Sequence, residues 1–239
     1  VAETGSTDTF TVVLNAQPAS NVVLSISSSD DGEATVTSAL TFTTANWNSA
    51  QTVTVTGADD NLVDGTQTST LTISIVDAVT DDNFDGVADQ TVSVATTDND
   101  VAGFTIAESG GSTSVSESGT TDTFTIVLNA QPNSDVVLSI TSSDTGEATV
   151  TSALTFTAAN WNSAQTVTVT GANDNLIDGT ITSTITVAIN DGSSDNNFDS
   201  VADQTVSVTT TDDDVAGFTI TQSGGSTSVS ESGTTDTFT

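Results

Sequence analysis

The chain has 239 residues, of which 32 are Asp or Glu and none is Lys, Arg or His, so its formal net charge at pH 7 is −32. Nucleic acids and anionic membrane surfaces are recognised by Lys and Arg, which excludes both as direct partners. The absence of Cys excludes disulfides and thiolate metal sites. No apolar run is long enough to span a membrane, and no segment has the pattern of a signal peptide.

An internal repeat of 114 residues organises the chain. Residues 1–100 and 115–214 are identical at 77 of 100 positions without a gap. A period of this length suits an independent domain rather than the short unit of a solenoid. We therefore divide the chain into a first repeat at 1–100 that lacks its first strand, a complete repeat at 101–214, and the N-terminal strands of a third repeat at 215–239.

The tail closely duplicates the beginning of the chain. Residues 229–239 read VSESGTTDTFT and residues 1–11 read VAETGSTDTFT. A tail that donated a strand to the first domain of the next molecule would bring these residues in duplicate. The sequence therefore favours an excerpt of a longer chain over strand donation.

The complete repeat has the pattern of a series of half-buried strands. In 121–129, the apolar residues Phe124, Ile126 and Leu128 alternate with outward-facing positions rich in threonine. Similar alternation follows around 136–140, 154–156, 167–169, 181–189 and 206–208, and the only prolines, Pro18 and Pro132, fall between strands. Seven or so strands in about 110 residues predict an all-β fold of tandem immunoglobulin-like sandwiches.

Acidic runs mark the boundaries between the repeats. TDNDVAGF occupies 97–104 and TDDDVAGF occupies 211–218. Two carboxylates about 6 Å apart repel by roughly 3 kcal/mol at an effective dielectric of ~20, and the chain has no cationic side chain to offset this. A site with only oxygen ligands favours Ca²⁺ over Mg²⁺, which keeps more of its water. The alternative is that these residues only cap strands and turns.

A family resemblance agrees with this interpretation. The order VSESG (115–119), DTFTIVLN (122–129), LTFTAANWNSAQTVTVTGANDN (154–175) and TTTDDD (209–214) resembles the Calx-beta domain, known from sodium–calcium exchangers and from tandem repeats of large bacterial surface proteins. The resemblance covers essentially the whole repeat. It implies an immunoglobulin-like sandwich that binds Ca²⁺ at one end, next to the following domain.

Carried over position by position, the resemblance implies a set of metal ligands. They comprise an early Glu, a loop Asp, an acidic stretch after the central strand and the closing Asp run. In the complete repeat these are Glu117, Asp144, Asn173, Asp174, Asp178, Asp212, Asp213 and Asp214, and in the first repeat they are Glu3, Asp30, Asp59, Asp60, Asp64, Asp98 and Asp100. Asn173 and Asn99 stand where carboxylates are possible, so the number and affinity of the sites stay open.

A second acidic loop is a weaker candidate. Asp81, Asn83, Asp85 and Asp89 imitate the spacing at the start of an EF-hand loop, and the second copy keeps Asp195, Asn197, Asp199 and Asp203. No bidentate Glu follows, and the flanks have the pattern of strands rather than helices. A polar hairpin loop held by Phe84 or Phe198 explains the same pattern, and we favour it slightly.

The sequence predicts a structural protein rather than an enzyme. General acid–base chemistry would rest on carboxylates alone, and the chain has two Trp and no Tyr to line a sugar cleft. We expect an extracellular or cell-surface rod or filament stiffened by Ca²⁺ at its joints, whose partners are neighbouring repeats and other copies in a fibre. The alternative is an adhesin module for a glycan or surface ligand, although Trp47 and Trp161 are more typical of the edge of a core.

Overall fold

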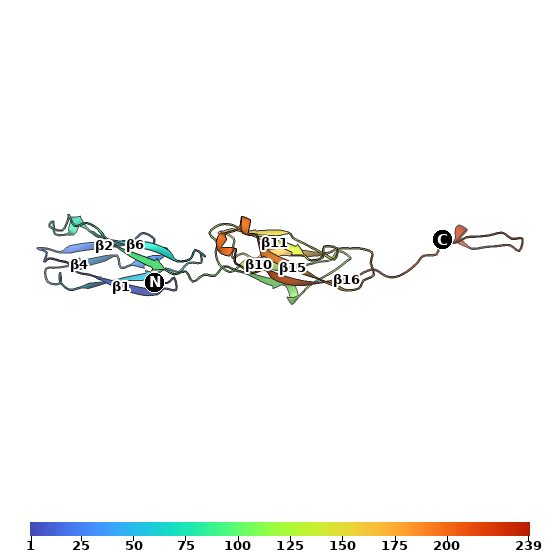
Figure 1. Ribbon diagram of the computed structural model, residues 1–239, viewed down its shortest axis with the longest axis horizontal. Coiled ribbons are helices and arrows are strands. Elements are labelled where there is room, and N and C mark those ends of the chain that lie inside the picture. The colour runs from blue at the N-terminus through green and yellow to red at the C-terminus, as the bar shows by residue number, and fades with distance from the viewer.

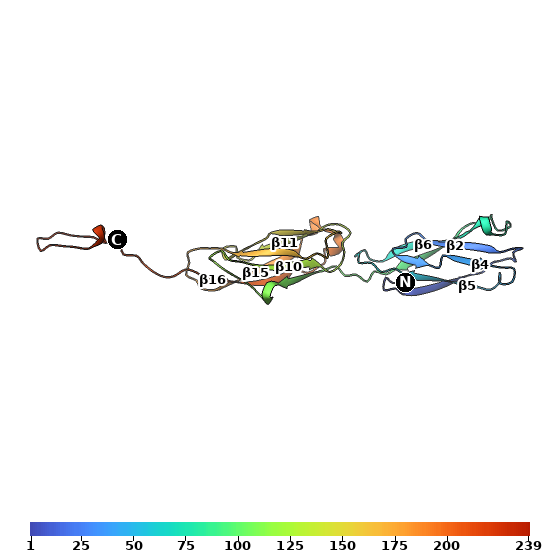
Figure 2. The same ribbon diagram turned by 180° about the vertical axis from the view of Figure 1, so that it is seen from behind.

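The computed structural model describes residues 1–239 and shows two β-sandwich domains placed end to end, followed by an extended tail (Figure 1). The view from behind shows the same rod-like arrangement (Figure 2). The predicted all-β sandwich is confirmed, because each domain has two sheets and its helices are single short 3-10 turns. None of these 3-10 turns has the length or the hydrophobicity of a membrane-spanning helix.

Domain 1 has a three-stranded sheet in the order β1-β5-β3 and a four-stranded sheet in the order β4-β2-β6-β7. All of its strand pairs are antiparallel. Its elements are β1 (Thr7–Val12), β2 (Val22–Ser28), β3 (Ala34–Val36), β4 (Ala39–Phe42), β5 (Gln51–Gly57), β6 (Gln67–Ile75), the 3-10 turn η1 (Asp77–Val79) and β7 (Gln90–Thr96).

Domain 2 has the sheets β12-β14-β10-β8 and β13-β11-β15-β16-β9, so it carries two strands that domain 1 lacks. Its first elements are β8 (Phe104–Glu108), η2 (Ser109–Gly111), β9 (Thr113–Ser116), β10 (Thr121–Leu128) and β11 (Val136–Ser142). The chain continues with β12 (Ala148–Val150), β13 (Ala153–Phe156), β14 (Gln165–Gly171), β15 (Ile181–Ile189), η3 (Asp191–Ser193), η4 (Asn196–Phe198) and β16 (Gln204–Thr211), and η5 (Ser223–Gly225) lies in the tail.

The core of domain 2 follows the period-two pattern of the sequence. Phe124 and Ile126 of β10 point inward together with Phe156 of β13, and all three are fully buried. Burial of such a side chain contributes about 1.5–3 kcal/mol. Trp161 is half-buried at the edge of this core, and its carbonyl oxygen accepts a hydrogen bond from the Leu128 amide at 3.1 Å.

The two extra strands of domain 2 cover both of its sheets. β8 pairs antiparallel with β10, so that Phe104 lies opposite Leu128 and Ile106 opposite Ile126. β9 pairs parallel with β16 on the other sheet. In domain 1 only Ala2 represents this second pairing, through a single bridge to Thr97. The core of domain 1 is accordingly less covered.

Candidate metal centre and inter-domain joint

A buried glutamate stands at the end of each domain that faces the next part of the chain. Glu117 directly follows β9, and its amide donates to the Thr211 carbonyl at 3.1 Å. A Cβ atom added to Gly171 would lie 2.0 Å from the Ser116 carbonyl oxygen, so the end of β14 can approach this segment only because it carries glycine. This close approach holds Glu117, whose side chain is only 1% exposed, between β14 and β16.

Carboxylates from three further segments gather around Glu117. One group consists of Glu117, Asp212 and Asp214, and a second consists of Glu117, Glu147 and Asp178. Within each group, ligand oxygens lie within 4.8 Å of one another. Glu117 belongs to both groups, so one carboxylate is common to the two candidate cation positions.

Domain 1 repeats this arrangement. Glu3, Asp98 and Asp100 form one group, and Glu3, Glu33 and Asp64 form the other. Glu3 is 1% exposed, and its Oε2 accepts a hydrogen bond from the Asn99 amide at 3.2 Å. We call the carboxylates around Glu3 cluster 1 and those around Glu117 cluster 2.

Several buried carboxylate oxygens in both clusters have no hydrogen-bond donor. They are Oε1 of Glu3, Oε2 of Glu33, Oδ1 of Asp64, Oδ2 of Asp100, both side-chain oxygens of Glu117, Oε2 of Glu147 and Oδ2 of Asp214. A buried anionic oxygen without a partner is strongly unfavourable. The chain has no basic side chain to supply one. The clusters therefore fit a hard cation, and their all-oxygen donor set suits Ca²⁺.

The crowding of these carboxylates perturbs their pKa values. Burial, reinforced by repulsion from Asp64 and Glu3, raises the pKa of Glu33 to about 7. Burial also raises the pKa of Glu117, with a smaller contribution from Asp212. The pKa of Asp212 is lowered instead, because the Gly179 and Asp214 amides donate hydrogen bonds to its carboxylate. Burial similarly raises the pKa values of Glu3, Asp64, Asp100, Glu147 and Asp214.

The structure brings many of the sequence-predicted residues together. The predicted Glu3, Asp64, Asp98 and Asp100 lie in cluster 1, and the predicted Glu117, Asp178, Asp212 and Asp214 lie in cluster 2. Asp60 and Asp174 lie beside the clusters, where each carboxylate accepts the amide hydrogen two residues later. Asp59 and Asn173 are exposed at the rim, and Asp213 is also exposed.

The loop carboxylate that joins each cluster differs from the one that the resemblance implied. Asp30 and Asp144 are exposed, and their carboxylates accept from the Gly32 and Gly146 amides at 3.0 Å. Glu33 and Glu147, three residues further on, point into the clusters instead. Each directly precedes a buried alanine that begins a strand, but a glutamate at such a position is not distinctive in the sequence alone.

The second acidic loop has the same structural role in both domains. The Asp195 carboxylate accepts hydrogen bonds from the amides of Asn133, Ser134 and Asn197, and Asp81 accepts equivalent bonds in domain 1. The other carboxylates, Asp85, Asp89, Asp199 and Asp203, are exposed, and no three carboxylates of this loop form a metal-sized group. The loop is held by backbone amides together with buried Phe198 or half-buried Phe84.

The loop between β5 and β6 connects cluster 1 to domain 2. Asp60 and Asp64 in this loop face cluster 1, whereas Val63 between them packs against the core of domain 2. The Val63 amide donates to the Gln131 carbonyl at 3.0 Å. The side-chain amide of Asn197 donates to the Val63 carbonyl at 2.6 Å. The same short loop thus carries carboxylates of the cluster and contacts of the joint.

No protein-family model matches the chain, and no curated protein sequence matches it. Similar solved structures include domains 4 and 5 of the S-layer protein SbsC, with 20% identity, a TM-score of 0.37 and coverage of 79% of this chain and 70% of that one. Domains 1–6 of SbsC give 19% identity and a TM-score of 0.39, covering 90% of this chain but only 28% of that one. The calcium binding domain CBD12 of CALX1.1 gives 12% identity and a TM-score of 0.30, covering 77% of this chain and 74% of that one. Similarities this low carry no functional conclusion for the chain.

Proposed function

We propose that the chain is a structural repeat of an extracellular rod or filament, in which Ca²⁺ at the end of each domain stiffens the joint to the next. The observation that carries this proposal is the pair of buried glutamates, Glu3 and Glu117, each of which has an unpaired oxygen and belongs to two carboxylate groups. A chain without any basic side chain can neutralise these groups only by taking up protons or cations.

The position of cluster 1 relates ion binding to the rigidity of the joint. Asp98 and Asp100 lie in the connection to domain 2, and Asp64 lies in the β5–β6 loop that contacts domain 2. Bound Ca²⁺ would neutralise the charge between these two segments and hold them to Glu3. The connection and the contact loop would then move together, which fixes the orientation of the two domains.

Thermal unfolding and small-angle scattering test this function directly. We expect the melting temperature to rise with added Ca²⁺ and to fall in excess chelator, because an ion that binds only the folded state stabilises it by about 2.7 kcal/mol at 100 times its dissociation constant. We expect the scattering curve of dilute protein to change from a stiff to a flexible rod in chelator. If neither the melting temperature nor the scattering curve changes between Ca²⁺ and chelator, the proposal is wrong.

A substitution at the joint separates ion binding from domain orientation. Val63→Ser is expected to make the rod flexible even in saturating Ca²⁺, because it removes the apolar contact with domain 2 and leaves the carboxylates in place. Scattering of dilute protein measures the flexibility, and calorimetric titration measures the Ca²⁺ affinity, which should change less than threefold. Ile177→Ser is the matched control, since Ile177 is the counterpart of Val63 and is exposed. Equal stiffness in both variants would show that Val63 does not determine the rigidity of the joint.

A further inference from the structure

Two acidic loops meet at the joint between the domains. The β5–β6 loop of domain 1 carries Asp59, Asp60 and Asp64, and the second acidic loop of domain 2, residues 195–203, carries Asp195, Asp199 and Asp203. The chain has no Lys, Arg or His, so no side-chain ion pair can hold these loops together. Apart from two Trp indoles, the available donors are backbone amides, the side-chain amides of Asn and Gln, and hydroxyl groups. The contact therefore depends on where the amide groups lie.

The β5–β6 loop lies against domain 2 as a short extended segment. Leu62 forms a parallel bridge with Gln131. The Gln131 amide donates to the Asn61 carbonyl at 2.7 Å, and the Val63 amide donates to the Gln131 carbonyl at 3.0 Å. These hydrogen bonds reach only backbone atoms of the loop. Domain 2 therefore recognises the main chain of residues 61–63, together with the apolar side chain of Val63.

Two side-chain amides of domain 2 converge on the Val63 carbonyl. Asn197 donates to it at 2.6 Å and Asn133 at 3.4 Å. Asp195 positions both residues, because its carboxylate accepts from the backbone amides of Asn133 at 2.6 Å and Asn197 at 3.0 Å. This aspartate is only 6% exposed. The carboxylate whose spacing imitates a metal loop thus holds two amide donors toward the neighbouring domain.

The side-chain amide of Asn83, the counterpart of Asn197 in domain 1, has a different acceptor. It donates at 2.8 Å to Oδ1 of Asp81 in its own loop, and the same oxygen accepts from the Asn83 backbone amide at 3.1 Å. In domain 2 the equivalent Oδ1 of Asp195 accepts only from the backbone amide of Asn197, whose side chain donates to Val63 instead. An Asn at this position therefore has two alternative acceptors, one within its loop and one in another domain.

We propose that the second acidic loop of domain 2 is a docking site for the main chain of the β5–β6 loop of domain 1, and that Asn197 completes the contact by exchanging the Asp195 carboxylate for the Val63 carbonyl. No atom of this docking site belongs to a carboxylate cluster, so docking does not require Ca²⁺. It rests on the proposed function only in placing the ion on the other side of the same loop. Loss of the ion frees the loop from domain 1, and loss of docking frees it from domain 2.

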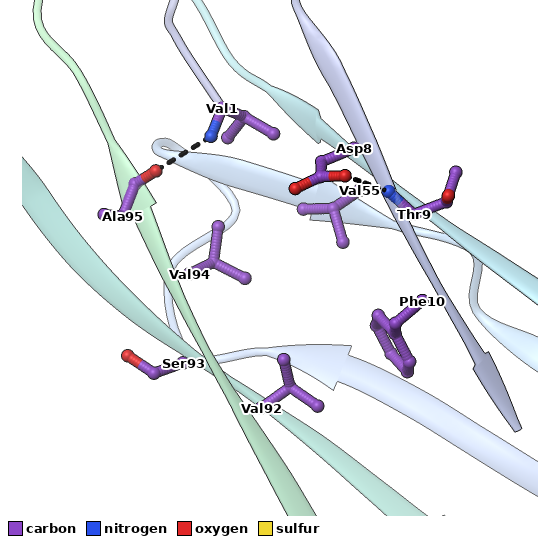
Figure 3. Close-up of a pocket in the computed structure, with 9 residues that line it drawn as sticks. All are labelled: Val1, Asp8, Thr9, Phe10, Val55, Val92, Ser93, Val94 and Ala95. Carbon is purple, nitrogen blue, oxygen red and sulfur yellow. Dashed lines mark hydrogen bonds between the residues drawn. The ribbon is translucent and has the colours of Figure 1, made fainter.

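The docking site is a surface contact and lies apart from the main cavities. Both of these cavities are in domain 1, and neither is lined by a residue of the β5–β6 loop or of domain 2. Figure 3 shows one of them, where Phe10 of one sheet faces Val92 of the other. The partner that fits the docking site is therefore an extended polypeptide segment.

Amide hydrogen exchange of the 239-residue chain tests the docking directly. We expect the Val63 and Gln131 amides to be protected equally in Ca²⁺ and in chelator, because their acceptors are carbonyls of the joint. Asn197→Ala should lower both protection factors roughly fivefold, the loss expected for one hydrogen bond between neutral groups. It should also make the rod flexible in saturating Ca²⁺, as measured by small-angle scattering, while the Ca²⁺ affinity measured by calorimetric titration stays that of the parent.

Three further variants separate docking from the folding of domain 2. Asn83→Ala is the matched control, because it removes the same side chain from a bond within domain 1 and should leave the joint unchanged. Asn133→Ala introduces the alanine that domain 1 carries at this position, and it should lower the protection less than Asn197→Ala because its bond to Val63 is longer. Val63→Ile introduces the residue of the second repeat and should keep the protection, since the main-chain contacts remain.

Two results would overturn the proposal. The first is protection of the parent joint that disappears in chelator, which would make docking depend on the ion. The second is an Asn197→Ala variant that keeps both the protection and the stiffness of the parent. A melting temperature that does not respond to Ca²⁺ would instead contradict the proposed function, and the expected exchange results would still support the docking site.

Discussion

Glu117→Gln is expected to shift the melting temperature of domain 2 in opposite directions with and without Ca²⁺. In chelator the substitution removes an ionisable group whose pKa is raised by burial, so domain 2 should melt at a higher temperature than the parent. In saturating Ca²⁺ it removes the carboxylate shared by both groups of cluster 2, so most of the calcium-dependent rise should be lost. Scanning calorimetry measures both, and we expect shifts of roughly 5 °C.

Asp213→Asn is the control for this substitution. It removes one negative charge next to cluster 2, but Asp213 is exposed and belongs to neither carboxylate group. Its melting temperature should follow that of the parent in both conditions. If Glu117→Gln lowered the melting temperature equally with and without Ca²⁺, the glutamate would serve packing alone, and cluster 2 would not be a metal centre.

The repeat made much of the fold predictable from the sequence. Alternation along 121–129 correctly placed Phe124, Ile126 and Leu128 inside, because one face of a paired strand must be buried. The sequence did not predict that β9 pairs with β16 on the opposite sheet from β8. That crossing depends on η2, where Gly110 and Gly111 adopt positive φ angles, and on the close approach of Gly171 to Ser116. Neither of these two features can be predicted from the spacing of the hydrophobic residues.

The candidate site was less predictable than the fold. The closing Asp runs stand out in sequence because they adjoin repeat boundaries, and the early glutamates were predicted from the resemblance to the Calx-beta domain. Glu33 and Glu147 do not, since a lone glutamate after a glycine is common in exposed turns. Only the folded arrangement shows that their side chains turn inward while Asp30 and Asp144 cap the turn. Likewise, the acidic spacing at 195–203 resembled a metal loop, whereas Asn197 contacts Val63 across the joint.

The stability of the calcium-free chain is expected to fall as the pH rises from about 4.5 to 7. The pKa of Glu33 is raised from 4.5 to about 7 in the folded state, so the folded state holds this proton over a range in which the unfolded state has lost it. The free energy of unfolding is therefore highest below the unfolded pKa and decreases as the pH rises through the folded pKa, by roughly 1–3 kcal/mol. Urea unfolding in chelator at a series of pH values measures this slope.

Calcium should reverse this dependence, because an ion that binds ionised carboxylates releases the protons held by cluster 1. We therefore expect the Ca²⁺ affinity of domain 1 to increase over the same pH range in which its calcium-free stability decreases.

Glu33→Gln should flatten the decrease of calcium-free stability with pH, while Asp31→Asn, at an exposed position two residues away, should leave it unchanged. A slope that persisted in Glu33→Gln would assign the proton to another carboxylate of the cluster. If the Ca²⁺ affinity did not vary with pH, the proton and the ion would not compete for the same carboxylates. Cluster 1 would then be an acidic core stabilised by protonation alone.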